Sequence, residues 1–285
     1  MAKHLITIGM ASLFLVTACG GRSSGSGADD PPQYGSEEFG LTSAELNSRI
    51  EAAEAKIATC MRRAGFDYVP VDAVTIRRAM DADKSKPGVT EEEYVEQYGF
   101  GITTVFEDPV SSLGRGEQNI AVQAGLAPGD QVAYDRALVG EPGSVGLARA
   151  LEDEDLSGTG GCTRKAVKSL FAKDELNGSY VNPGDVLLEQ DPRMITAIEA
   201  WSTCMKDKGF DYAHPDDVTD ELTERRDALL GGADPASLTG AAADALAALQ
   251  DEERAVAVVA TACEEEEIAS VQEEIESEIY GAPQP

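Results

Sequence analysis

Four cysteines are the residues whose chemistry the sequence defines most clearly. They are widely separated along the chain: Cys60, Cys162, Cys204 and Cys263. A metal site needs clustered ligands such as C-x-x-C, and no two of these cysteines are closer than 42 residues. If the chain is exported, an even number of cysteines predicts disulfides instead, and four cysteines allow three connectivities. We therefore expect two disulfides, with no bound metal and no cofactor.

The fifth cysteine, Cys19, has a different chemistry because of the residues that precede it. A short polar segment is followed by the apolar run Leu5–Val16, which is too short to span a membrane. The next residues, "VTAC", look like a bacterial lipobox, in which the chain is cleaved before the cysteine and diacylglycerol is attached to its sulfur. We expect residues 1–18 to be a lipoprotein signal peptide and Cys19 to be the lipidation site. The alternative is an ordinary secretory signal that happens to contain a cysteine.

The lipid on Cys19 is the expected contact with the membrane. Two acyl chains anchor a protein stably, which predicts a location on the outer face of the cytoplasmic membrane, within the cell envelope. Residues 19–41 are rich in Gly, Ser, Pro and acid, which predicts a flexible tether. The chain has 52 acidic and 23 basic residues and a formal net charge of −29. So acidic a chain is a poor ligand for nucleic acid, and we expect no nucleic-acid partner.

A nine-residue motif occurs twice, as "CMRRAGFDY" at Cys60–Tyr68 and as "CMKDKGFDY" at Cys204–Tyr212. When Ile57–Val74 is compared with Trp201–Val218, nine of 18 positions are identical. Chance would give about one identity, so the match indicates an internal duplication.

Each copy of the motif lies at the end of a predicted helix. The first helix begins at "TSAE", with the spacing of a capping box, and the second begins at "DPR", with an aspartate N-cap. Gly65 and Gly209 stand where a left-handed residue ends a helix, and the phenylalanine that follows each glycine is placed to fold back on the methionine of the motif. We interpret the motif as a helix terminator beside a cysteine. The residues just beyond the two terminators are the candidate ligand site: Asp67, Tyr68, Asp211 and Tyr212.

Each cysteine at a helix end needs a partner from another segment. Asp234–Tyr280 has one long helical pattern with Cys263 on its apolar face, which favours Cys263 as the partner of Cys204. By the same reasoning we expect Cys60 to pair with Cys162, so that each disulfide stays within one copy of the repeat.

The expected fold is mainly α, with two tandem disulfide-stapled helical modules at residues 42–180 and 181–285. The first module contains a loop-rich insert at residues 84–160. Within this insert, Gly101–Phe106 predicts a short strand and Pro128–Leu138 predicts a helix.

With its lipobox, its doubled "CM" plus "GFDY" helix end and its later segment "LQDEERAVAVVATAC", the chain resembles uncharacterised surface lipoproteins of high-GC Gram-positive bacteria. The resemblance is best over the second half, from Trp201 to Cys263, and the first copy departs from it in the long insert. It implies a helical, disulfide-stapled envelope protein and implies no activity.

Signatures of catalysis are weak in this sequence. "GRSSG" lies in the predicted tether, with no strand before it and no helix after it, so it does not form a nucleophile elbow. Asp153–Gly158 begins like a calcium loop, but the twelfth position is Arg164 where such a loop has glutamate. His214 is a lone candidate base, and the corresponding residue of the first copy is Pro70. Trp201 lies on the apolar face of its helix and is expected in the core.

These features predict a lipid-anchored envelope protein that works as a non-enzymatic binding or accessory module. Its expected partner is a cell-wall polymer or another envelope protein. One alternative is a cell-wall hydrolase that uses two carboxylates, although the spacing of the acids selects no particular pair. The other alternative is a structural or chaperone-like envelope lipoprotein.

Overall fold

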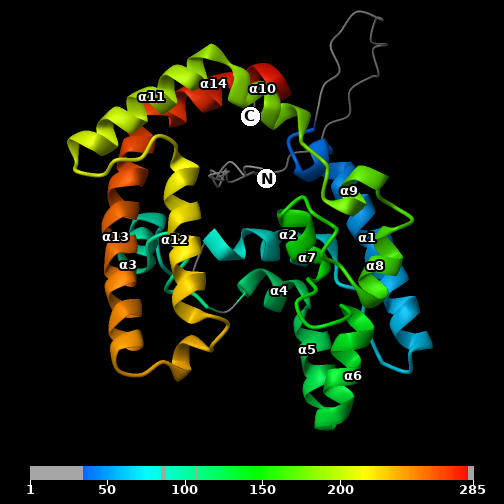
Figure 1. The fold of residues 1–285 in the computed structure, drawn as a ribbon. Helices are drawn as coiled ribbons and strands as arrows, with labels where there is room; N and C mark the ends of the chain where they lie inside the picture. The colour runs from blue at the N-terminus through cyan, green and yellow to red at the C-terminus, as the bar shows by residue number, and fades with distance from the viewer. Residues whose placement is uncertain (1–34, 85–87, 107, 282–285) are drawn as a thin grey trace, which may run out of the picture.

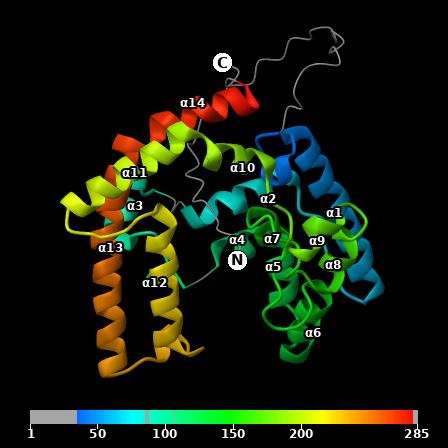
Figure 2. The ribbon, with the colours of Figure 1, turned by 45° about the horizontal axis from the view of Figure 1, so that its top comes forward.

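The computed structural model describes residues 35–84, 88–106 and 108–281. Within these ranges the fold is helical and has no strand, only two isolated β-bridges (Figures 1 and 2). The mainly α fold is therefore confirmed, whereas the predicted signal peptide and Cys19 lie outside the described residues. None of the helices in the described ranges is long and apolar enough to cross a membrane.

The helices follow one another in two groups. Those that precede the second copy of the motif, with two short 3-10 turns, are η1 (Glu38–Gly40), α1 (Ser43–Arg63), α2 (Ala73–Met80), η2 (Asp81–Lys84), α3 (Glu91–Tyr98), α4 (Pro109–Gly114), α5 (Glu117–Ala124), α6 (Pro128–Leu138), α7 (Leu147–Glu152), α8 (Gly161–Val167), α9 (Lys173–Asn177) and α10 (Pro183–Gln190). The others are α11 (Pro192–Asp207), α12 (Pro215–Leu230), η3 (Pro235–Ser237), α13 (Ala241–Glu267) and α14 (Ala269–Tyr280). The helix predicted at Pro128–Leu138 is α6.

The first hydrophobic core is built around α1, which begins at the predicted capping box of Thr42 and Glu45. Its apolar face is buried at helical spacing and packs against α2 and α8. The buried residues of this face are Leu46, Ile50, Ala53, Ile57 and Met61. The core extends through α4, α6 and α7 as far as Phe171, so the loop-rich insert supplies much of it.

The second hydrophobic core lies among α11, α12, α13 and α14 (Figure 1). Trp201 is fully buried there and donates its indole N–H to the carbonyl oxygen of Ala260 at 3.2 Å, so its predicted core position is confirmed. The prediction of one helix over Asp234–Tyr280 is wrong in two places. Regular helix starts only after Gly240, and it breaks at Ile268, whose side chain is buried in the core where the chain turns from α13 into α14.

One segment of the insert packs on the second core although it belongs to the first half of the sequence. Helix α3 lies against α13 in Figures 1 and 2, and Phe100 and Ile102 pack against the second core. The strand predicted at Gly101–Phe106 is wrong, because the N–H groups of Ile102 and Thr103 bond to the carboxylate of Glu253 and not to a neighbouring strand.

The end of the predicted tether at residues 19–41 also differs from expectation. Phe39 and Leu41 are buried in the first core, and the ring of Phe39 contacts those of Phe171 and Tyr180 at 5.5 and 5.3 Å between centroids. Burial of one such side chain stabilises a fold by about 1.5–3 kcal/mol, so both residues favour packing of this short segment on the helices. Composition does not indicate this packing, because Phe39 and Leu41 are outnumbered by the polar residues around them.

Candidate functional site

Both copies of the motif end their helices with the same hydrogen bonds. Phe66 N–H donates to the carbonyl of Met61 at 3.0 Å, and Phe210 N–H donates to that of Met205 at 2.9 Å. The glycine before each phenylalanine has a positive φ, +90° at Gly65 and +97° at Gly209. This is the Schellman geometry that the sequence predicts.

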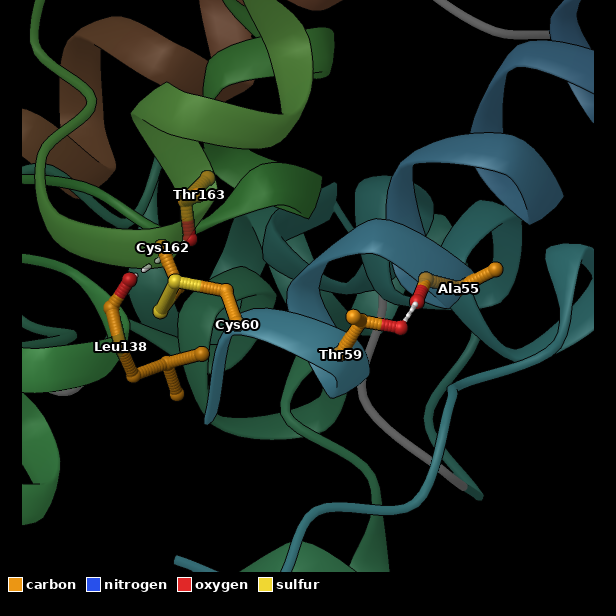
Figure 3. The surroundings of a disulfide bond; sticks show 6 residues. All are labelled: Ala55, Thr59, Cys60, Leu138, Cys162 and Thr163. Atoms are coloured by element: carbon orange, nitrogen blue, oxygen red, sulfur yellow. Dashed lines mark hydrogen bonds between the residues drawn. A yellow bond between two sulfur atoms is a disulfide. The ribbon is translucent and has the colours of Figure 1, made fainter. Parts of the chain in front are cut away.

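The disulfides join each terminator to a second helix. Cys60 at the end of α1 pairs with Cys162 of α8, and Cys204 pairs with Cys263 of α13, with Cα atoms 5.6 and 5.9 Å apart. Figure 3 shows the first pair beside Thr163, whose hydroxyl donates to the carbonyl oxygen of Leu138 at 3.0 Å. These are the pairs that the sequence favours.

The four residues proposed as a ligand site do not come together. Tyr68 is buried in the first core, whereas Tyr212 is half-buried against the second. Asp67 is exposed, and the exposed Asp211 lies 3.6 Å from the ammonium group of Lys206. A single site shared by the two copies is therefore not formed by these side chains.

Tyr68 is the member of this set that lines a cavity. The cavity has a volume of about 150 Å³ and lies among α1, α4, α6, α7 and α8. Much of its wall is apolar, from residues such as Ile57, Leu138 and Leu147. The polar residues that line it are Glu54, Tyr68, Ser111, Arg115, Ser144 and Thr163.

The carboxyl group of Glu54 is the most unusual group in the cavity. Glu54 is 2% exposed, and its Oε2 accepts hydrogen bonds from the Tyr68 hydroxyl and from Val71 N–H, both at 3.0 Å. Burial raises the pKa of Glu54 to about 7, although these two hydrogen bonds oppose the shift. Burial, together with the nearby Glu54, raises the pKa of Tyr68, so the phenol stays a neutral donor.

Arg115 is the cation that lines the cavity, but it is paired with other residues. Its Nη1 lies 2.9 Å from Oδ1 of Asp135 and 2.7 Å from Oε1 of Gln123. Glu54 itself forms no ion pair with any described residue. The hydroxyl of Tyr134, which is buried beneath Phe66, has no hydrogen-bond partner within the described chain.

The second copy of the repeat lacks this arrangement. A shift of 144 positions aligns Glu54 with Ile198, which packs against the second core. The second copy therefore has no carboxyl group at the helix position that Glu54 occupies, and the acid that hydrogen-bonds with the Tyr212 side chain is Glu221 of α12. The duplicated helix end is common to both modules, but an acid at this position of the helix is present in the first copy alone.

A second buried glutamate, Glu253 of α13, joins its helix to the turn that follows α3. Its carboxylate accepts hydrogen bonds from Ile102 N–H at 2.7 Å, from Thr103 N–H at 2.8 Å and from the Thr103 hydroxyl. The amide of Gln250 donates to the carbonyl of Thr103 at 2.8 Å. The "LQDEE" segment thus holds the turn that follows α3 through hydrogen bonds from Glu253 and Gln250. Gly99 is needed in this turn because a Cβ there would lie 2.6 Å from Cγ of Glu253.

The remaining sequence candidates have structural roles. Arg164 stands where a calcium loop has glutamate. Its guanidinium group donates to the carbonyl oxygens of Leu156 and Leu176, both at 2.7 Å, and so holds this loop through its main chain. The imidazole of His214 caps α12 by accepting Asp216 N–H at 3.2 Å. Within the described ranges, no group of three metal-type side chains is placed to hold a metal ion. "GRSSG" lies outside the described residues.

Glu54 was not among the site residues predicted from the sequence, although the sequence contains a signal for it. Glu54 stands four residues after Ile50 and three before Ile57, and so on the apolar face of α1. An acid on such a face must find hydrogen-bond donors inside the fold, and here it finds Tyr68 and Val71.

Glu54→Gln is expected to change how stability depends on pH. The folded-state pKa of about 7 lies above that of the unfolded chain, so the stabilising effect of the proton is complete below about pH 4.5 and is lost as the pH rises through 7. The free energy of unfolding of the wild type should therefore be roughly 3 kcal/mol lower at pH 8 than at pH 4.5 through this group, and Glu54→Gln should not show this decrease. Urea unfolding at pH 4.5 and pH 8 measures it.

The exposed Glu51 on the same helix provides the matched control. Glu51→Gln should follow the wild-type pH dependence. If Glu54→Gln also followed it, the carboxyl group of Glu54 would not be the titrating group.

Comparison of the chain with protein-family models, with curated proteins and with solved structures finds no match.

Proposed function

We propose that this protein is a lipid-anchored component of the cell envelope that binds a ligand and catalyses no reaction. The lipobox at Cys19 supports the anchor and the location on the outer face of the cytoplasmic membrane. The disulfides Cys60–Cys162 and Cys204–Cys263 support the same location, because such bonds persist in oxidising compartments outside the cytoplasm.

The observation that carries the binding role is the cavity beside Glu54. It combines a buried carboxyl group with the hydroxyls of Tyr68, Ser111 and Ser144, which can orient a small polar molecule. A hydrolase that acts through two carboxylates needs a second acid about 5–9.5 Å from the first. Glu54 is the one acid that lines this cavity, so the geometry favours binding over hydrolysis here.

The partner proposed from the sequence is a cell-wall polymer or another envelope protein, and it is compatible with this arrangement. A short polar group projecting from such a partner could enter the cavity. The half-buried Ser111, Arg115 and Ser144 connect the cavity to the surface.

Cys19→Ala is expected to release the protein from the membrane. The wild-type chain should sediment with membranes and incorporate labelled fatty acid, whereas the variant should incorporate none and appear in the soluble fraction. Fractionation of cells expressing each chain measures this.

Ser23→Ala, four residues beyond Cys19 in the predicted tether, is the matched control and should fractionate like the wild type. Membrane retention of Cys19→Ala together with loss of the label would mean that some other segment holds the protein, and the lipid-anchor proposal would fall.

A further inference from the structure

We propose that the cavity beside Glu54 binds a small primary ammonium ion, whose N–H groups donate to the Glu54 carboxylate. This inference rests on the proposed binding function and gives it a ligand class. Four properties of the cavity favour such a ligand: an uncompensated buried acid, a free acceptor, a limited volume and a single titrating group.

The first property is a buried acid that no protein cation compensates. Glu54 is 2% exposed and has no ion pair among the described residues. Arg115 lines the same cavity, but its guanidinium is paired with Asp135 at 2.9 Å. An isolated carboxylate in an apolar surrounding is costly, and a cation brought by a ligand would remove that cost.

The second property is unused acceptor capacity. An ionised carboxylate can accept about four hydrogen bonds. The two donors of Glu54, the Tyr68 hydroxyl and Val71 N–H, both bond to Oε2. Oε1 has no donor within the described chain and belongs to a residue that lines the cavity. An ammonium group supplies three donors and suits this oxygen better than a neutral alcohol with one donor.

The third property is size. A cavity of about 150 Å³ is comparable to an engineered protein cavity that accepts benzene, so the ligand is limited to roughly six non-hydrogen atoms. The apolar wall formed by Ile57, Leu138 and Leu147 suits a short alkyl chain behind the ammonium group. A metal cation fits less well, because Glu54 is the one acid in the lining and metal ions need several such ligands.

The fourth property is that one group dominates the titration near neutral pH. Burial raises the pKa values of Tyr68 and of Tyr134, the latter to about 12, so both stay neutral. Arg115 at the end of α4 is held with Asp135 of α6, and α7 and α8 contribute no titratable side chain to the cavity. Binding of a cation should therefore follow ionisation of Glu54, weakening roughly 30-fold from pH 8 to pH 5.5 for a pKa of about 7.

The test is calorimetric titration of the full chain in detergent with n-propylammonium chloride, and with 1-propanol as a neutral probe of the same length. At constant ionic strength and pH 8 the cation should bind at least tenfold more tightly than the alcohol, and its affinity should fall roughly 30-fold at pH 5.5. Glu54→Gln should weaken cation binding tenfold or more and remove its pH dependence.

Two further variants separate the cavity from general attraction to an acidic protein. Glu154→Gln removes a half-buried carboxyl group whose pKa is also raised to about 7 but which does not line the cavity, and it should bind the cation like the wild type. Tyr68→Phe keeps the carboxyl group of Glu54 but removes one hydrogen bond to it. The pKa of Glu54 should therefore rise, and affinity for the cation should begin to fall at a higher pH than in the wild type.

Undiminished binding by Glu54→Gln, equal losses in Glu54→Gln and Glu154→Gln, or no binding of n-propylammonium at pH 8 would each overturn the inference. None of these results would affect the fractionation of Cys19→Ala, so the ligand class can fail while the lipid anchor stands.

Discussion

Replacement of both Cys60 and Cys162 by alanine is expected to lower the free energy of unfolding by about 4–5 kcal/mol. The two residues are 102 positions apart, and a cross-link over so long a loop strongly restricts the unfolded chain. Since natural domains are stable by only about 5–15 kcal/mol, the loss would be about a quarter or more of the total. Denaturant unfolding of the non-reduced proteins, monitored by circular dichroism, measures it.

The second disulfide gives an internal comparison. Cys204 and Cys263 are 59 positions apart, so the corresponding double variant should lose slightly less, about 4 kcal/mol. Cys19→Ala removes a cysteine without opening either bond and should unfold at the wild-type denaturant concentration. Peptide mapping without reduction should find the same two pairs, and an unchanged unfolding midpoint in either double variant would contradict the prediction.

Glu253→Ala is expected to release α3 and the turn after it from the second core. The carboxylate of Glu253 is the acceptor for both Ile102 N–H and Thr103 N–H, and both donors would be left without a partner inside the fold. Hydrogen bonds to a charged group are worth about 1.5–3 kcal/mol each, so we expect a local cost of about 3–6 kcal/mol. Hydrogen exchange should become much faster in peptides covering residues 91–105.

The neighbouring Glu252 provides a sharp control for this experiment. It is an exposed acid on the same helix, paired with Arg225 at 2.6 Å, and exposed pairs contribute about 0–1 kcal/mol. Glu252→Ala should leave exchange in residues 91–105 unchanged. Equal exchange in the two variants would mean that apolar packing, and not the carboxylate, holds this segment.

The sequence predicted the features whose causes are local. The ends of α1 and α11 depend on residues within one or two turns, a capping residue before the helix and a glycine after it, and both were predicted correctly. The pairing of Cys204 with Cys263 followed from the position of Cys263 on the apolar face of its helix.

The features that the sequence did not predict depend on distant partners. The segment Gly101–Phe106 has the composition of a strand, but its N–H groups are taken by Glu253, which is about 150 positions away. The cavity was missed for the same reason, because Ser111, Arg115 and Ser144 come from the insert and meet Glu54 only in the folded chain.

Both missed sites nevertheless share one signal in the sequence. Glu54 lies between Ile50 and Ile57, and Glu253 lies between Leu249 and Val256, at the same helical spacing. Each acid stands on a buried face and accepts main-chain N–H from a loop, one such bond at Glu54 and two at Glu253. At these two positions, an acid on the apolar face of a helix therefore indicates a place where a loop packs against that helix.

The packing of α3 on α13 has a consequence for the order in which the chain can fold as it is made. Thr103 leaves the ribosome 150 residues before Glu253, the acceptor for its N–H group. At about 5–20 residues per second, the interval is roughly 8–30 s. By the end of that time α1 and α8 have both been synthesised, while α3 still lacks its partner. The nascent first half therefore carries one unfinished segment until the last long helix emerges, and the two halves become one structure only at the end of synthesis.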